Sequence, residues 1–395
     1  MAPEPDAPRV QAVTAPRSVD SKLPAVGTTI FTVMSRLAAE CGAINLSQGF
    51  PDFDCDPALV DAVARHMRQG RNQYAPMQGA PPLREAIARK FRHFHGATYD
   101  PESEITVTSG GTEALFDAIA AVVRPGDEVV VIEPCYDSYV PAILLNGGTP
   151  VVASMRLSDF TIDWDDVRKA VGSKTRLMVI NSPHNPSGSV LTASDVRELE
   201  AIVERSPALI LSDEVYEHII FNGTVHESMA RHPALAARSF IIGSFGKTFH
   251  TTGWKVGYCV APAELTTEFR KVHQFVTFAT NTPVQHALAE FTVPERLVTL
   301  GPFYQQKRDR FLELMKGSSF RPLACEGSYF QLMDYAAISD EDDETFAVRL
   351  TTDHGVASIP LTPFLSKQKA PRVVRFCFAK TDETLEAAAK RLRVL

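Results

Sequence analysis

Short apolar runs alternate with longer amphipathic stretches between about residues 60 and 295. The runs are almost continuously apolar, which is typical of strands that are covered on both faces of a sheet. The stretches between them carry apolar residues at helical spacing, so the pattern predicts an α/β domain with a mainly parallel sheet. The predicted strands are residues 105–108, 129–132, 177–181, 209–212, 240–242 and 256–260.

A different pattern follows a predicted helix at residues 303–314. Strands separated by charged loops are predicted there, and a last helix follows at residues 383–393. This succession indicates a smaller α+β domain, and a cleft between two domains is a common place for a ligand. The predicted organisation is a flexible extension at residues 1–21, a large domain at residues 60–295, and a small domain at residues 22–59 and 296–395.

Composition narrows the possible classes of function. The 395-residue chain has a net charge of −7 and scattered Lys and Arg residues, which argues against a nucleic-acid binder. No apolar run approaches the ~18 residues of a membrane-spanning helix, and no signal-peptide pattern is present. Six cysteines lie far apart without a C-x-x-C pair, so free thiols in a reducing cytoplasm are expected rather than a metal or redox site. The sequence favours a cytoplasmic protein that acts on small molecules.

The most informative segment is SFGKT at residues 244–248, which follows an apolar strand and precedes TGWKVG at residues 252–257. A lysine at the end of a buried strand, near glycine, a hydroxyl and a second cation, suits a site that bonds to an aldehyde and holds a phosphate. Gly246-Lys247-Thr248 also matches the end of a P-loop. That motif requires a glycine six positions before the lysine, and Ile241 stands there.

The chain resembles the class I and II aminotransferases of pyridoxal-phosphate (PLP) fold type I from Lys22 to Leu395. Within this family it is most similar to the methionine and kynurenine (glutamine-type) aminotransferases, because of NLSQGFPDF at residues 45–53 and RFCFAK at residues 375–380. The resemblance implies a large domain whose mainly parallel seven-stranded sheet lies between helices, with a smaller α+β domain beside it. It also implies a homodimer with shared active sites.

The resemblance assigns the central chemistry to four residues. Lys247 would bond to the PLP aldehyde and, once freed, move a proton at the substrate Cα, which requires a neutral amine. Asp213, in SDEVY at residues 212–216, would keep the pyridine nitrogen protonated, whereas Glu214 is expected to point elsewhere. Tyr216 and Asn185 would bind the phenolic oxygen of PLP. From the residues alone, Asp213 could instead cap a helix and Asn185 could lie in an ordinary turn.

The implied phosphate site combines a glycine turn with a second segment. SGGTEAL at residues 109–115 leads from a strand into a helix, whose positive end favours an anion. Tyr136 would stack on the pyridine ring, with a core tyrosine as the alternative. The residues expected at the phosphate are Gly110, Gly111, Thr112, Ser244 and Lys255, with Tyr74 reaching in from the other subunit. Many relatives carry Arg at the position of Lys255. A lysine there keeps the positive charge but cannot make the two parallel hydrogen bonds of a guanidinium.

Substrate binding is expected to depend on Arg375, because a guanidinium makes two parallel hydrogen bonds to an α-carboxylate. Gly49 would offer a backbone N–H to the same carboxylate, and Asn185 would lie beside it. Arg372, three positions earlier, is expected on the opposite face of the strand and in contact with solvent. The histidines interpreted as surface residues are His93, His95, His226 and His232.

The predicted function is a ping-pong aminotransferase, in which an L-amino acid gives its amine to PLP and a 2-oxo acid takes it away. The resemblance suggests methionine, aromatic amino acids or kynurenine, and glutamine as donors. The nearest alternative is a fold type I cysteine-conjugate (C–S) β-lyase, because the same carbanion can expel a leaving group. A P-loop nucleotide hydrolase is a remote alternative that Ile241 disfavours. A PLP-containing transcription regulator would need an added DNA-binding domain and a more basic chain.

Overall fold

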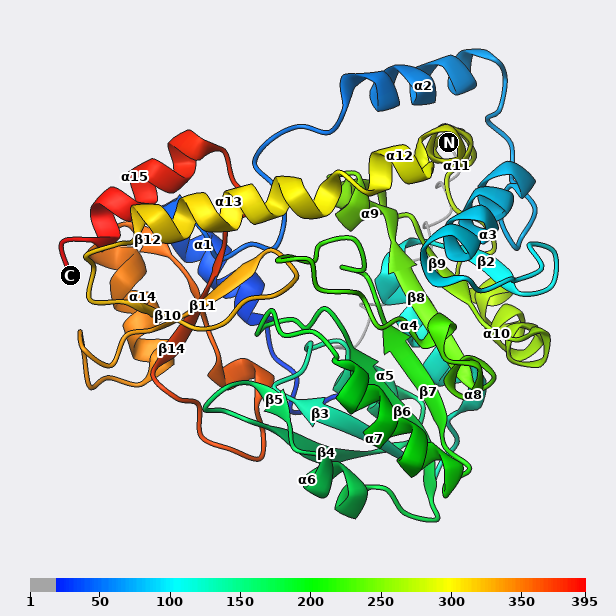
Figure 1. The fold of residues 1–395 in the computed structure, drawn as a ribbon, viewed down its shortest axis with the longest axis horizontal. Helices are drawn as coiled ribbons and strands as arrows, with labels where there is room; N and C mark the ends of the chain where they lie inside the picture. The colour runs from blue at the N-terminus through cyan, green and yellow to red at the C-terminus, as the bar shows by residue number, and fades with distance from the viewer. Residues whose placement is uncertain (1–18) are drawn as a thin grey trace, which may run out of the picture.

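The computed structural model describes residues 19–395. The predicted extension at residues 1–21 therefore lies almost entirely outside the described residues. The described residues form three sheets: a large one, a smaller one at the opposite end of the molecule, and a two-stranded pair (Figure 1). Among the helices of residues 19–395, none has the length and apolar character needed to cross a lipid bilayer.

The large sheet has eight strands in the order β2-β9-β8-β7-β6-β3-β4-β5 (Figure 1). The strands from β8 to β4 pair in parallel, whereas β9 is antiparallel to both β2 and β8. The mainly parallel sheet is confirmed, and it has one strand more than the seven expected because the short β5 folds back along β4. The strands are β2 (Ile105–Thr108), β3 (Glu128–Glu133), β4 (Thr149–Arg156), β5 (Thr161–Ile162), β6 (Thr175–Asn181), β7 (Leu209–Asp213), β8 (Ser239–Ser244) and β9 (Gly257–Val260).

Alternate residues of the central strands face two different layers of helices. Val129 and Val131 of β3 belong to one hydrophobic core, and their neighbours Val130 and Ile132 belong to the other. Both faces of the strand are therefore apolar, which explains the continuous apolar run in its sequence. The first core contains α4 (Gly110–Val122), α5 (Tyr139–Leu145) and α10 (Ala263–Val276); the second contains α3 (Pro81–His95), α6 (Trp164–Ala170) and α7 (Ala193–Glu204).

The smaller sheet is antiparallel, in the order β10-β11-β14-β13. A separate parallel pair joins β1 (Ile44–Asn45) to β12 (Val356–Ala357), so a segment before the large sheet packs with the C-terminal part of the chain. This pairing supports the proposed small domain, which would span residues 22–59 and 296–395. Its other elements are α1 (Ile30–Cys41), α13 (Leu300–Leu314), β10 (Arg321–Pro322), β11 (Phe330–Asp334), α14 (Asp343–Thr352), β13 (Ile359–Pro360), β14 (Val373–Cys377) and α15 (Asp382–Leu392).

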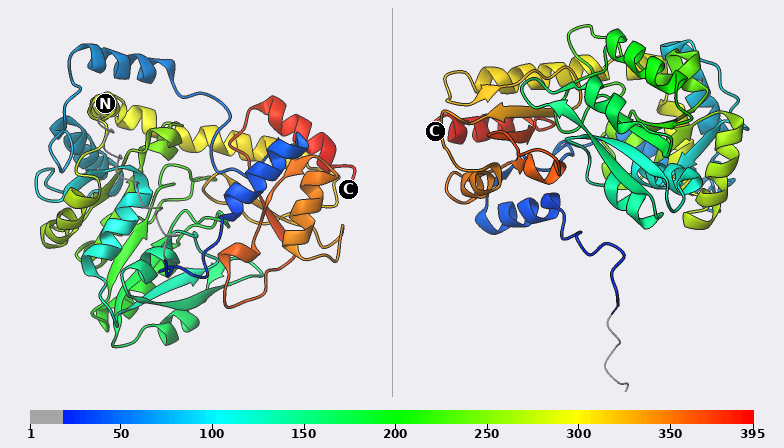
Figure 2. Two further views of the ribbon diagram at one scale, coloured as in Figure 1. Left: turned by 180° about the vertical axis from the view of Figure 1, so that it is seen from behind. Right: turned by 90° about the horizontal axis from the view of Figure 1, so that it is seen from below.

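The remaining helices lie at the edge of the large sheet or within loops. At the outer edge, α2 (Pro57–Arg68) packs across α11 (Thr282–Phe291) (Figure 2). The turn α9 (Phe245–Thr248) directly follows β8, so it places the SFGKT segment at the carboxyl end of the sheet. The other short helices are η1 (Met229–Arg231), α8 (Pro233–Ala236), η2 (Thr252–Trp254), α12 (Pro294–Leu297) and η3 (Thr362–Phe364).

Candidate active site

Residues from both sheets line a cavity of about 340 Å³. Three neighbouring parallel strands end at it, with Asn181 closing β6, Asp213 closing β7 and Ser244 closing β8. The smaller sheet contributes Phe330 and Arg375. Ligands of open α/β sheets bind at the carboxyl ends of the strands, and pockets of about 300 to 1,000 Å³ hold small molecules. The cavity has the position and size of a small-molecule site.

Lys247 enters this cavity from α9. Its Nζ donates hydrogen bonds to Tyr329 Oη at 2.9 Å and to the backbone oxygen of Gly49 at 3.3 Å. Burial lowers the pKa of Lys247 to about 8, with help from the positive charges of Arg375 and Lys255 and despite the opposing charge of Asp213. The amine therefore loses its proton far more easily than an ordinary lysine, as reaction with an aldehyde requires.

Asp213 faces the cavity from the end of β7. Tyr139 Oη donates to its Oδ2 at 2.6 Å, and the backbone N–H of Val215 donates to its Oδ1 at 3.4 Å. Burial raises the pKa of Asp213 to about 6, although the Tyr139 hydrogen bond and the charge of Lys247 both lower it. The donors that reach this carboxylate are neutral, so a protonated ring nitrogen would supply the missing positive charge.

Glu214, the adjacent acid, points away from the cavity as expected. Its Oε1 accepts a hydrogen bond from Ser212 Oγ at 2.8 Å, and its Oε2 lies 2.8 Å from His226 Nε2. The interpretation of His95 and His226 as surface residues is wrong, because only 4% and 7% of their side chains are exposed. The buried carboxylates of Glu217 and Glu214 face the rings of His95 and His226. The acid and the histidine of each pair are not adjacent in the sequence, so no local pattern predicts that the histidine is buried.

Gly110, Gly111 and Thr112 form the first turn of α4 and line the cavity. The first N–H groups of a helix have no partner within the helix, so they can bind an anion. Gly110 has a φ of +81°, and a Cβ added there would lie 3.3 Å from Lys255 Nζ. A Cβ added at Gly111 would lie 3.9 Å from the Cβ of Ser244. The glycine turn, a hydroxyl and a cation therefore meet, as predicted.

Arg375 is buried in β14 and reaches the cavity from the smaller sheet. One terminal nitrogen donates to Asn185 Oδ1 at 2.7 Å and the other to the Ser47 backbone oxygen at 3.1 Å. The guanidinium carbon lies 3.8 Å from the centre of the Phe330 ring, and Nε has no hydrogen-bond partner in the described chain. Burial lowers the pKa of Arg375 to about 10. Arg372 instead forms an exposed ion pair with Asp340, outside the cavity as expected.

Asn185, Tyr216 and Tyr136 complete the predicted set within the cavity. The backbone N–H of Asn185 donates to Asn181 Oδ1 at 2.8 Å, which fixes the turn that follows β6. The Tyr216 ring lies edge-on to Tyr329 with centroids 5.0 Å apart, and burial raises the pKa of Tyr216. Gly49 lines the cavity as well, so every predicted site residue except one gathers here.

Tyr74 is the exception. Its side chain is 82% exposed and lies edge-on against Phe278, with ring centroids 5.5 Å apart. It lines a separate surface hollow with Asn281 and Thr282. A single chain therefore does not bring Tyr74 to Lys247.

Two further tyrosines contact the central residues and were not predicted. Tyr139 donates to Asp213, and Tyr329 lies between Lys247 and the backbone oxygen of Gly49. Their partners are 74 and 82 positions away in the sequence. The only local signals were their places beside Tyr136 and within GSYF at residues 327–330.

Residues 42–392 match the family model described as aminotransferase class I and II. Methionine aminotransferase of Escherichia coli is 50% identical over 377 residues, which cover 95% of this chain and 98% of that protein. Kynurenine–oxoglutarate transaminase of Dictyostelium discoideum is 32% identical over 93% of this chain and 94% of that protein.

Solved structures agree with these sequence matches. The crystal structure of YbdL from Escherichia coli, identified with a methionine aminotransferase function, has a TM-score of 0.94 at 49% identity and covers 96% of this chain and 100% of its own. N-succinyldiaminopimelate aminotransferase from Mycobacterium tuberculosis has a TM-score of 0.92 at 37% identity, over 95% of this chain and 100% of its own. The expected PLP fold type I architecture is confirmed. The chain belongs to the class I and II aminotransferase family.

Proposed function

We propose that this aminotransferase uses PLP to move the amino group of an L-amino acid to a 2-oxo acid in a ping-pong cycle. The main support for the proposal is that the Lys247 amine and the Arg375 guanidinium line the same cavity. Burial lowers the pKa of Lys247 to about 8, and the Nε of the buried Arg375 has no hydrogen-bond partner among residues 19–395. An easily deprotonated amine can bond to an aldehyde, and an available guanidinium can bind a carboxylate.

The residues of the cavity fit PLP group by group. The first turn of α4, together with Ser244 and Lys255, suits the phosphate, and Asp213 suits the protonated pyridine nitrogen. When bound, PLP supplies an electron-withdrawing ring that stabilises negative charge at the substrate Cα. Asn185 and Tyr216 are proposed to bind the phenolic oxygen of PLP. Lys247 is proposed to bond to the aldehyde, and Tyr136 is proposed to stack on the face of the ring.

The chain's own residues would orient the substrate and move its proton. Stacking on Phe330 and hydrogen bonds to Asn185 and Ser47 fix the plane of the Arg375 guanidinium before a substrate arrives. The backbone N–H of Gly49 is the proposed second donor to the α-carboxylate. The Nζ of Lys247 lies 3.3 Å from the oxygen of that same Gly49, so the amine and the proposed carboxylate donor share one part of the cavity, and Lys247 is the proposed base for the Cα proton.

Methionine is the first proposed donor, followed by aromatic amino acids or kynurenine and by glutamine. Phe31, Phe50 and Phe330 line the cavity, and phenylalanine faces favour a thioether or an aromatic ring. One methylene is worth only about 1 to 3 kcal/mol of discrimination, so several donors are expected. The named relatives are aminotransferases, which favours transamination over the β-lyase alternative and over a P-loop nucleotide hydrolase.

A homodimer in the cytoplasm is also part of the proposal, with Tyr74 completing the phosphate site of the partner subunit. Support comes from the 82% exposed Tyr74 and the 86% exposed Phe275. Large aromatic side chains at this exposure are typical of an interface that a second subunit covers. The division into a large domain at residues 60–295 and a small domain at residues 22–59 and 296–395 also belongs to this proposal.

Absorption spectra of the purified protein test the proposal. We expect a band between about 360 and 430 nm that moves toward about 330 nm when methionine is added and returns when a 2-oxo acid follows. Lys247→Ala can hold PLP only without a covalent bond, so methionine should not move its band toward about 330 nm, whereas the exposed Lys271→Ala should respond like the wild type. A protein that binds no PLP would overturn the proposal. A protein that releases pyruvate from cysteine conjugates without needing a 2-oxo acid would favour the β-lyase.

A further inference from the structure

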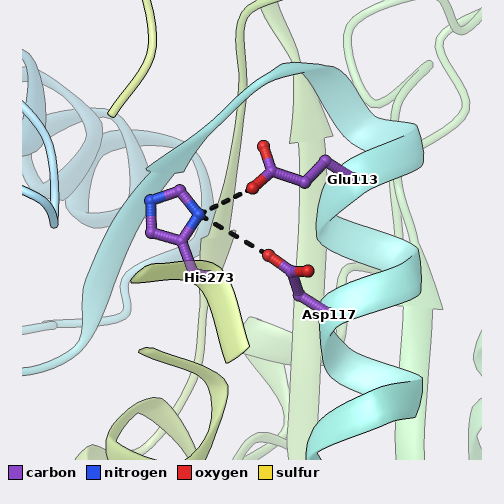
Figure 3. A group of neighbouring side chains, drawn as sticks. All are labelled: Glu113, Asp117 and His273. Atoms are coloured by element: carbon purple, nitrogen blue, oxygen red, sulfur yellow. Dashed lines mark hydrogen bonds and ion pairs between the residues drawn. The ribbon is translucent and has the colours of Figure 1, made fainter. Parts of the chain in front are cut away.

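A buried histidine faces two acids behind the glycine turn of α4 (Figure 3). His273, on α10, places its Nδ1 2.7 Å from Glu113 Oε1 and 3.5 Å from Asp117 Oδ2, and both acids lie on α4. The side chains of His273 and Asp117 are fully buried, and that of Glu113 is 7% exposed. None of the three lines the cavity, so none is explained by direct contact with PLP or substrate.

Glu113 also reaches back to the turn itself. Its Oε2 accepts a hydrogen bond from the backbone N–H of Ser109, the residue that precedes Gly110. The other ring nitrogen of His273, Nε2, lies 2.9 Å from the backbone oxygen of Met77. The pair therefore ties α10 both to the start of α4 and to the segment that carries Tyr74.

The ring of His273 is a cation in this arrangement. Both ring nitrogens face oxygen acceptors, so both carry protons. Burial alone would lower the pKa of His273, but the two acids that face its Nδ1, Asp117 and the hydrogen-bonded Glu113, outweigh it and raise the pKa to about 9. Burial raises the pKa of Asp117 to about 6, which leaves Glu113 as the principal anionic partner.

A bound metal ion explains this geometry less well than a direct hydrogen bond. Zinc lies about 2.0 to 2.2 Å from nitrogen and oxygen ligands, so two of its ligand atoms are usually more than about 3 Å apart. The 2.7 Å between His273 Nδ1 and Glu113 Oε1 is the length of a charge-assisted hydrogen bond.

We infer that the Glu113–His273 ion pair is a positioning device that holds the Ser109–Gly110–Gly111 turn in its anion-binding conformation. Two adjacent glycines leave the backbone free to adopt other conformations, and the anchored Ser109 N–H removes part of that freedom. The inference rests on the proposed function, because the anion concerned is the phosphate of PLP. Neither residue is a catalytic residue, since neither touches the cavity.

Affinities of the PLP-free protein for PLP and for pyridoxal test this inference. The two compounds share the pyridine ring, but only PLP carries a phosphate, so the change in their affinity ratio from wild type to variant isolates the phosphate contribution. Glu113→Ala and His273→Gln should weaken PLP binding at least about tenfold while changing pyridoxal binding little. Glu113→Gln, which retains an acceptor for the Ser109 N–H, should recover part of the loss. His93→Gln, an exposed histidine, is the matched control.

Each outcome bears on the inference separately from the proposed function. Equal losses for PLP and pyridoxal, or no loss for either, would overturn the positioning role while leaving the aminotransferase proposal intact. Stoichiometric binding of Zn²⁺ that His273→Gln abolishes would replace the ion pair with a metal site. A wild-type protein that binds neither PLP nor pyridoxal would overturn the proposed function and this inference together.

Discussion

The Tyr139 hydroxyl, on α5, donates a 2.6 Å hydrogen bond to Asp213 Oδ2 at the end of β7. This contact orients the carboxylate, because within residues 19–395 the only other hydrogen bond to that carboxylate comes from the backbone N–H of Val215 at 3.4 Å. Tyr139 thus holds Asp213 at the place where the pyridine nitrogen of PLP is expected.

Tyr139→Phe should lower kcat/KM about tenfold, the usual cost of losing a hydrogen bond to a charged group. The tyrosine donor lowers the pKa of Asp213, so its loss should also move the acidic limb of the pH–rate profile to higher pH. Tyr99→Phe is the control, because Tyr99 is a buried tyrosine whose hydroxyl has no partner in the described chain. Equal effects of the two substitutions would contradict the positioning role of Tyr139.

Asp213→Asn should change how the stability of the PLP-free protein depends on pH. The folded pKa of about 6 lies above the ordinary value of 3.8, so the buried acid costs little at low pH, destabilises the fold as pH rises from 3.8 to 6, and costs no more above 6. The variant should therefore gain about 2.5 kcal/mol over the wild type between about pH 4 and pH 7.5. Urea unfolding at both pH values measures this gain. A constant difference between the two proteins would show that Asp213 is not buried as a charged group.

Arg375→Lys should raise KM for methionine about a hundredfold, with a smaller fall in kcat, because lysine cannot make the paired hydrogen bonds to the α-carboxylate. Arg372 lies three residues earlier and forms an exposed ion pair with Asp340. Arg372→Lys should therefore leave KM and kcat near their wild-type values. Steady-state kinetics with methionine measure both variants. An unchanged KM in Arg375→Lys would remove this residue from the substrate site.

Mixing two inactive variants tests whether Tyr74 serves the partner subunit. In a mixed dimer of Lys247→Ala and Tyr74→Ala chains, one site carries both defects and the other carries neither. Random exchange of subunits should therefore restore about a quarter of wild-type activity. No restoration would place Tyr74 and Lys247 in the same chain's site or separate Tyr74 from the reaction.

The sequence best predicted those site residues that lie at the ends of apolar strands. Asp213 and Ser244 end apolar strands that are recognisable locally and Lys247 follows one, so their meeting at one edge of a parallel sheet could be predicted. Arg375 required a resemblance, because it comes from a distant strand of the other sheet. The roles of Tyr139 and Tyr329 could not be predicted, since only the folded chain reveals their partners.

Local sequence pattern also failed to predict two features of the fold, the strand β5 and the burial of two histidines. The short β5 pairs only through Met155 and Arg156 of β4, so no periodicity marks it, and the sheet was expected to have seven strands. The burial of His95 and His226 depends on Glu217 and Glu214, which face them across the core. In a sequence, polar residues that are buried as ion pairs cannot be told apart from polar residues on the surface.

Borohydride reduction of the PLP-loaded protein, followed by peptide mass spectrometry, tests the central claim most directly. Reduction fixes PLP to whichever amine it has bonded, so the modified peptide identifies the lysine. We predict that the peptide containing Lys247 carries the whole label and that Lys247→Ala carries none. A label on any other lysine, or a wild-type protein without label, would contradict the account.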